Sequence, residues 1–150
     1  MKTIPTADIS IVLAEDDDGQ ATLVERHLHR AGSEARFLRV RNGLELLEIL
    51  DRNTELARRP LLILMDIRMP YLDGIETLSR LKTKERTAVI PVYILSTTDD
   101  PREVERCFRL GCNAYIVKPI LPDALIEAIR RLTSFLEITT LPATIPDATA

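Results

Sequence analysis

A chain of 150 residues with 45% hydrophobic and 29% charged side chains has the composition of one ordinary globular domain with enough core to fold alone. Its net charge of −3 and its lack of a long basic run argue against a nucleic-acid-binding surface. No stretch approaches the roughly 18 apolar residues of a membrane span, and the N-terminus has no signal-peptide apolar region, so we expect a cytoplasmic protein.

The first half of the chain predicts alternating strands and helices after a short leader at residues 1–8. Short apolar runs indicate buried strands, and apolar residues three or four positions apart indicate helices. In chain order we expect a strand at 9–14, a helix from about 17 to 31, a less apolar edge strand at 35–40, a helix that follows the turn signal Asn42-Gly43 and carries Leu44, Leu47 and Leu50, a polar connection at 53–60 and a strand at 61–65. The last strand is the most apolar, so we expect it at the centre of the sheet with both faces covered.

The second half continues the alternation. In chain order we expect a helix capped by Asp73 with Ile75, Leu78 and Leu81 on one face, a strand at 90–95, a helix opened by Asp99, Asp100 and Pro101 and ended by Gly111, a strand at 113–117, and a helix from about 121 to 136 with Leu125, Ile129, Leu132 and Leu136 as its buried stripe. The remaining residues, 138–150, form a tail that is either disordered or extended against a partner.

Four of the expected strands end in polar side chains with useful chemistry. Strands that alternate with helices form a parallel sheet, so their carboxyl ends lie along one edge, where open α/β sheets keep their sites. We therefore expect these side chains to meet there: Glu15 and Asp16 after the first strand, Asp66 after the third, Ser96 after the fourth and Lys118 after the fifth.

This set of side chains favours phosphoryl chemistry. Three carboxylates in one small site repel one another, and a hard divalent cation such as Mg²⁺ relieves that repulsion through oxygen ligands. The cation and the Lys118 ammonium would then offset the charge of a phosphoryl group. Asp66 is the natural nucleophile, because a carboxylate can carry an acyl phosphate, and Ser96 can donate a hydrogen bond to a phosphoryl oxygen.

The segments that carry these residues resemble the receiver domain of two-component response regulators. LAEDD resembles the acidic pair after the first strand, LMDIRMPYLDG the phosphoacceptor segment, ILSTT the hydroxyl segment and YIVKP the lysine-proline segment. The resemblance covers about residues 9–137. It implies a flavodoxin-like (βα)5 fold, doubly wound, with a five-stranded parallel sheet in the order 2-1-3-4-5 and helices on both faces.

The resemblance also implies how the site binds its ligands. Asp66 would be the phosphoacceptor, and Lys118 would contact the phosphoryl group. Asp16, Asp66 and the backbone carbonyl of Arg68 would bind Mg²⁺ or Mn²⁺. Glu15 would act mainly through a water molecule.

A conformational switch is a further implication of the resemblance. Ser96 would move toward the phosphoryl group and Tyr115 would change rotamer with it. Thr97 stands where a smaller residue would give the phosphoryl group more room, so it would affect the rate of phosphoryl loss. The peptide bond between Lys118 and Pro119 would be cis.

The resemblance predicts a conformational switch rather than an enzyme. It also predicts that a sensor histidine kinase phosphorylates this switch. No segment beyond the receiver is long enough for an output domain, so we expect output through protein contact or a downstream phosphotransfer protein. The segments STTDD, NAYIVKP and FLEITTLP resemble stand-alone receivers that serve bacterial phytochromes. This match predicts a bacteriophytochrome as the kinase and a homodimer with residues 138–150 as its interacting arm.

Three other interpretations stay open at this point. A phosphohydrolase of the haloacid dehalogenase type would need a second acid two residues after Asp66, where this chain has Arg68. A nucleotide- or flavin-binding module would need a glycine-rich loop after the first strand, where EDDDGQ would repel phosphate. A degenerate receiver would act as a constitutive adaptor. We expect Cys107 and Cys112 to be reduced and partly buried, and His27 and His29 to have no site role.

Overall fold

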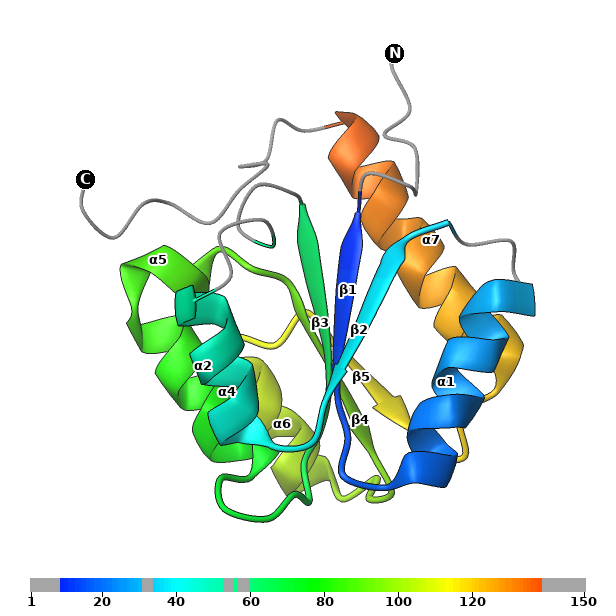
Figure 1. The fold of residues 1–150 in the computed structure, drawn as a ribbon. Helices are drawn as coiled ribbons and strands as arrows, with labels where there is room; N and C mark the ends of the chain where they lie inside the picture. The colour runs from blue at the N-terminus through cyan, green and yellow to red at the C-terminus, as the bar shows by residue number, and fades with distance from the viewer. Residues whose placement is uncertain (1–8, 31–33, 53–55, 57–59, 139–150) are drawn as a thin grey trace.

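A five-stranded parallel sheet lies between two layers of helices in the computed structural model, which describes residues 9–30, 34–52, 56 and 60–138, with side chains described as far as residue 131 (Figure 1). The strands are β1 (Ser10–Ala14), β2 (Arg36–Val40), β3 (Leu61–Asp66), β4 (Val92–Ser96) and β5 (Ala114–Val117). The helices in the described part are α1 (Asp18–Arg30), α2 (Gly43–Arg52), α4 (Gly74–Thr83), α5 (Glu85–Ala88), α6 (Pro101–Leu110) and α7 (Pro122–Ile138). The sheet order is β2-β1-β3-β4-β5, so the expected fold class is confirmed.

The hydrophobic core has two parts, one on each face of the sheet. Successive residues of a strand point to opposite faces, so Ile63 and Met65 of β3 pack on one side, while Leu62 and Leu64 pack on the other. Helices α2, α4, α5 and α6 cover the first face, and α1 and α7 cover the second (Figure 1). Every residue of β3 is buried, as expected for a central strand, whereas β2 and β5 form the edges and are partly exposed.

The helix ends near the site have specific caps. The Asp73 side chain accepts a hydrogen bond from the backbone N–H of Glu76 (2.8 Å) at the start of α4, which confirms the expected cap. Asp100 accepts from the N–H of Arg102 (3.0 Å) at the start of α6. That helix ends at Gly111, whose φ of 108° lies in the left-handed region where a side chain would be strained.

Two local expectations were wrong. The pair Asn42-Gly43 does not form a separate turn, because Gly43 begins α2 and the Asn42 side chain accepts from the N–H of Glu45 (3.0 Å) as a cap. Leu50 is buried and Leu47 packs against the core as expected, but Leu44 is exposed and Leu46 is buried in its place. The short helix α5 was missed, since a single turn is too short to show a helical period.

Some expectations lie outside the described residues. They are the leader at 1–8, the tail beyond Ile138, most of the connection at 53–60, and the packing of the Leu132 and Leu136 side chains. Helix α7 reaches Ile138, slightly beyond its expected end. None of the helices in the described ranges has the length and apolar character needed to cross a membrane.

Candidate functional site

The register of the sheet brings the polar strand ends into one row. Ala14 of β1 lies opposite Met65 of β3, so Glu15 emerges beside Asp66. Asp66 lies opposite Leu95 of β4. Ser96 lies opposite Val117 of β5, directly before Lys118. The expected side chains therefore come from adjacent strands at the carboxyl edge of the sheet.

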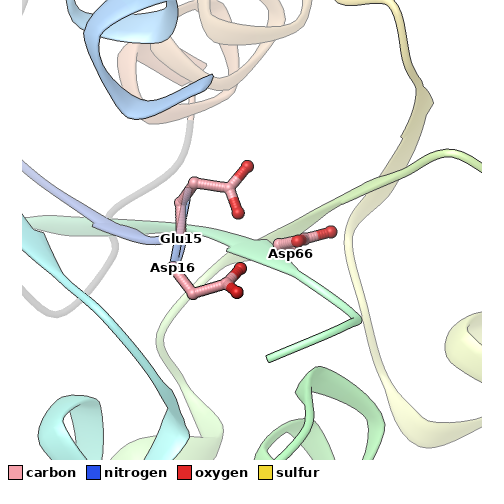
Figure 2. Close-up of side chains that lie close together, drawn as sticks. All are labelled: Glu15, Asp16 and Asp66. Atoms are coloured by element: carbon pink, nitrogen blue, oxygen red, sulfur yellow. The ribbon is translucent and has the colours of Figure 1, made fainter. Parts of the chain in front are cut away.

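Three carboxylates form a tight cluster at this edge. One oxygen each from Glu15, Asp16 and Asp66 lies within 4.8 Å of the other two. Figure 2 shows the three side chains extending from the ends of β1 and β3 into one region. Glu15 and Asp66 are buried, whereas Asp16 is exposed, so solvent reaches the cluster from the Asp16 side.

Lys118 provides the positive charge of the cluster. Its Nζ lies 2.6 Å from Oε1 of Glu15 and 3.5 Å from Oδ1 of Asp66, and only 6% of its side chain is exposed. A buried ammonium needs such partners, because an unpaired buried charge is strongly destabilising. The backbone N–H of Ile67 also donates to Oδ1 of Asp66 (2.9 Å). These two contacts set the orientation of the Asp66 carboxylate.

The charges and polar atoms of the cluster fit a divalent cation. When all three carboxylates and Lys118 are ionised, the cluster has two more negative than positive charges. Oε2 of Glu15 is buried without a hydrogen-bond partner among the described residues. Burial, together with the nearby Asp66, raises the pKa of Glu15 to about 7 despite the lowering effect of Lys118. Carboxylate oxygens with unmet negative charge are the ligands that Mg²⁺ and Mn²⁺ prefer.

Ser96 and Tyr115 both bond to a residue that the sequence did not single out, Thr98. Oγ of the buried Ser96 accepts a hydrogen bond from the Thr98 N–H (3.2 Å). The Tyr115 hydroxyl donates to the Thr98 carbonyl (2.8 Å). The segment after β4 is therefore held through its backbone by both candidate switch residues. No side-chain type signals this role, because every residue except proline supplies both backbone groups.

The remaining candidate residues lie around the cluster. Arg68 follows β3 and its side chain is exposed. Thr97 is exposed directly after Ser96. The Lys118–Pro119 peptide bond, between β5 and α7, is cis.

Arg39 is a second residue near the cluster whose role the sequence did not predict. Its Nε and Nη2 both donate to the backbone carbonyl of Glu15 (3.0 and 2.8 Å), and its Nη1 donates to Oδ1 of Asp18 (2.6 Å). These contacts support the segment that carries Glu15 and Asp16. A basic residue near the end of a strand next to an acidic loop is the available sequence signal, and it is a weak one.

The family model described as the response regulator receiver domain matches residues 11–130, which is most of the chain. The chain belongs to this family. Receivers of this kind are signalling switches rather than classical enzymes, and phosphorylation by a histidine kinase is expected for the family. Membership removes the phosphohydrolase and nucleotide-binding interpretations.

The chain is similar over most of its length to a known response regulator and to a receiver domain of known structure. Response regulator Rcp1 from Synechocystis sp. is 32% identical over 136 residues, which cover 89% of this chain and 92% of Rcp1. A crystal structure of a receiver domain from Rhodospirillum rubrum is 37% identical, has a TM-score of 0.73, and is matched over 91% of this chain and 99% of that one. The receiver therefore spans nearly the full length of these similar chains.

Two further crystal structures show such receivers in functional states. The phosphorylated cyanobacterial phytochrome response regulator RcpA is 29% identical, with a TM-score of 0.70 and coverage of 89% of this chain and 97% of that one. The Mn²⁺-bound form of response regulator Rcp1 is 30% identical, with a TM-score of 0.70 and coverage of 90% and 99%. The receiver thus resembles phytochrome response regulators.

Proposed function

We propose that this receiver accepts a phosphoryl group from a sensor histidine kinase on Asp66 and signals by changing the face formed by α6, β5 and α7. One observation carries the proposal: the buried Asp66 carboxylate lies within a cluster of three acids and beside the buried Lys118 ammonium. This arrangement is the one that a carboxylate nucleophile for phosphoryl transfer requires.

The transfer itself uses side chains of the cluster. An oxygen of Asp66 attacks the phosphorus of a phosphohistidine; the new O–P bond forms as the P–N bond breaks, and the imidazole nitrogen leaves with its electron pair. The products are an acyl phosphate on Asp66 and, because the departing ring carries a proton on its other nitrogen, a neutral histidine. The Lys118 ammonium, 3.5 Å from Asp66, offsets charge on the phosphoryl oxygens, and Ser96 donates a hydrogen bond to one of them.

We propose Asp16, Asp66 and the Arg68 backbone carbonyl as ligands for Mg²⁺ or Mn²⁺, with Glu15 acting through water. The bound cation would screen the repulsion between these carboxylates and the incoming phosphoryl oxygens. The unpartnered Oε2 of Glu15 and the negative charge of the cluster support this assignment. The Mn²⁺-bound form of Rcp1 supports it from a similar protein.

Thr98 gives the proposed switch a physical route. Movement of Ser96 toward a phosphoryl group would break its hydrogen bond from the Thr98 N–H and free the segment after β4. The Thr98 carbonyl would then shift, and Tyr115 would lose its present hydrogen bond. Thr97, which lies between these groups, would limit access to the phosphoryl group and so set its lifetime.

The partners are also part of the proposal. The likeness to the phytochrome response regulator RcpA supports a bacteriophytochrome as the kinase. Exposed Phe108 on α6, Val117 on β5 and Leu121 after it support a homodimer through this face. We place the receiver at residues 9–137, with 1–8 as a leader and 138–150 as a dimerisation arm. A cytoplasmic location and a downstream phosphotransfer protein complete the proposed pathway.

The test is modification of Asp66 in the full chain. With Mg²⁺ and acetyl phosphate, mass spectrometry should find one added phosphoryl group, and with beryllofluoride the backbone amides of Ile67 and Thr98 should shift in NMR spectra. The matched variant Asp66→Asn should show neither change. A wild-type protein that stays unmodified and unshifted would contradict the proposal and favour the constitutive adaptor.

A further inference from the structure

Strand β2 holds the backbone of Glu15 on both sides. The N–H of Glu15 donates to the Val40 carbonyl (3.0 Å). The Glu15 carbonyl accepts two hydrogen bonds from the Arg39 guanidinium, at 3.0 Å from Nε and 2.8 Å from Nη2. The first of these contacts is made by backbone alone, whereas the second depends on a particular side chain.

The Glu15 carbonyl matters because it belongs to the peptide unit that leads into Asp16. That unit is planar, so fixing the direction of its C=O also fixes the direction of the Asp16 N–H and Cα. Asp16 is the exposed member of the acidic cluster and begins the segment before α1. A rotation of this peptide would carry the Asp16 carboxylate away from Asp66.

Arg39 is suited to hold this peptide. Its side chain is only 21% exposed, and its planar guanidinium contacts the Glu15 carbonyl on one side and Oδ1 of Asp18 (2.6 Å) on the other. A lysine could not hold both groups in a fixed fork. Arg41 pairs with the same Asp18 oxygen (2.9 Å) from a more exposed position. The two arginines therefore share one acidic partner but differ in the contact with the carbonyl.

We propose that Arg39 is a positioning residue for the cation site, which orients the Glu15–Asp16 peptide so that the Asp16 carboxylate stays beside Asp66. The inference rests on the proposed function, because it concerns the same cluster. It gives the edge strand β2 an indirect role in cation binding, because Arg39 orients a ligand without being a ligand itself.

Charge and position predict opposite results when Arg39 is replaced. Removing a positive charge near a cation site strengthens cation binding if charge alone matters. Losing the hold on the peptide weakens binding, and groups that orient ligands typically change metal affinity by about 10- to 100-fold. A fall in affinity therefore indicates the positioning role.

The experiment measures Mg²⁺ and Mn²⁺ binding to the full chain by calorimetry for wild type, Arg39→Gln, Arg39→Lys and Arg41→Gln. We expect Arg39→Gln to bind roughly tenfold more weakly and Arg39→Lys to be intermediate. Arg41→Gln should bind as tightly as wild type or more tightly. In the metal-free protein, the Asp16 amide should shift in NMR spectra of Arg39→Gln and stay in place in Arg41→Gln.

Folding is followed separately by urea unfolding of each variant. If Arg39→Gln does not fold, the comparison of Arg39→Lys with Arg41→Gln decides the matter. Unchanged or tighter binding in the folded Arg39 variants, or equal loss in Arg41→Gln, overturns the positioning role while the proposed function stands. A wild-type protein that binds neither cation nor beryllofluoride overturns both.

Discussion

Replacement of Gly74 by alanine should destabilise the protein and disturb the phosphoacceptor at once. Gly74 is the first residue of α4, and its N–H donates to the Ile67 carbonyl (2.7 Å). A Cβ added there would lie 2.3 Å from the Asp66 carbonyl oxygen and 2.8 Å from Cα of Ile67. Both neighbours are backbone atoms, so no side-chain rotation can relieve the clash. Either the start of α4 or the end of β3 must move.

The size of the effect follows from these distances. Overpacking of a well-packed region typically costs about 1–3 kcal/mol. Alanine is favoured over glycine in a helix interior by up to about 1 kcal/mol, but Gly74 lies at the helix start, where this gain is small. We therefore expect a net loss of about 2 kcal/mol or more, which for a chain of this length lowers Tm by roughly 4–8 °C.

Urea unfolding followed by circular dichroism measures this loss, and Gly19→Ala is the matched control. Gly19 lies in α1, and its added Cβ would meet only the Asp17 side chain at 3.2 Å. Gly19 is the second residue of α1, so the gain from alanine is small there too, and Asp17 Oδ1 also accepts from the Gln20 N–H (2.8 Å). Because the contact is with a side chain that needs to move only slightly, Gly19→Ala should change stability by less than about 1 kcal/mol. Gly74→Ala should also weaken beryllofluoride binding. A Gly74→Ala protein as stable as Gly19→Ala, with an unshifted Ile67 amide, would refute this reasoning.

Three other predictions follow from burial and exposure. In the metal-free protein, the pKa of Glu15 is raised to about 7, so the folded state keeps a proton that the unfolded state loses above pH 4.5. The contribution of Glu15 to the free energy of unfolding should therefore decline as pH rises toward about 7. Urea midpoints from pH 4 to 8 should show this decline in wild type beyond that in Glu15→Gln, and Mg²⁺ should reduce it; parallel curves would contradict it. Burial raises the pKa of Cys107, and that of Cys112 to about 12, so iodoacetamide at pH 8 should modify both thiols only after unfolding, as followed by mass spectrometry; fast labelling of the native protein would disprove this. Phe108→Glu should weaken self-association roughly tenfold, whereas the control Leu23→Glu on α1 should leave it unchanged, as measured by light scattering. A wild-type protein that is monomeric both with and without beryllofluoride would exclude the dimer.

The sheet and the cluster could be predicted because both follow from chain order. Strict alternation of strands and helices makes the strands parallel, and this alone brings Glu15, Asp66, Ser96 and Lys118 to one edge. The expected cap at Asp73 also appeared, because caps depend on a few neighbouring residues. Such features need only local sequence and topology.

The contacts that support the cluster could not be predicted in the same way. The hold of Arg39 on the Glu15 carbonyl depends on side-chain reach between two strands, which no period in the sequence records. The link through Thr98 uses a backbone N–H and a carbonyl that every residue except proline possesses. On α2, helical spacing with Leu47 and Leu50 fits both Leu44 and Leu46, and only the packing against the sheet decides that Leu46 turns inward. Each case needs the tertiary arrangement.

The strands that carry the acidic cluster and Lys118 are held in the sheet by different numbers of neighbours. Strand β3, which carries Asp66, is hydrogen-bonded to a strand on each side, whereas β5, which leads to Lys118, is an edge strand bonded only to β4. Moving β3 would break two ladders of hydrogen bonds, and moving β5 would break one. A rearrangement that starts at the acidic cluster therefore moves the edge strand β5 more easily than the interior strand β3. The strand order alone thus favours transmission toward the β5 edge, whether or not a partner is bound.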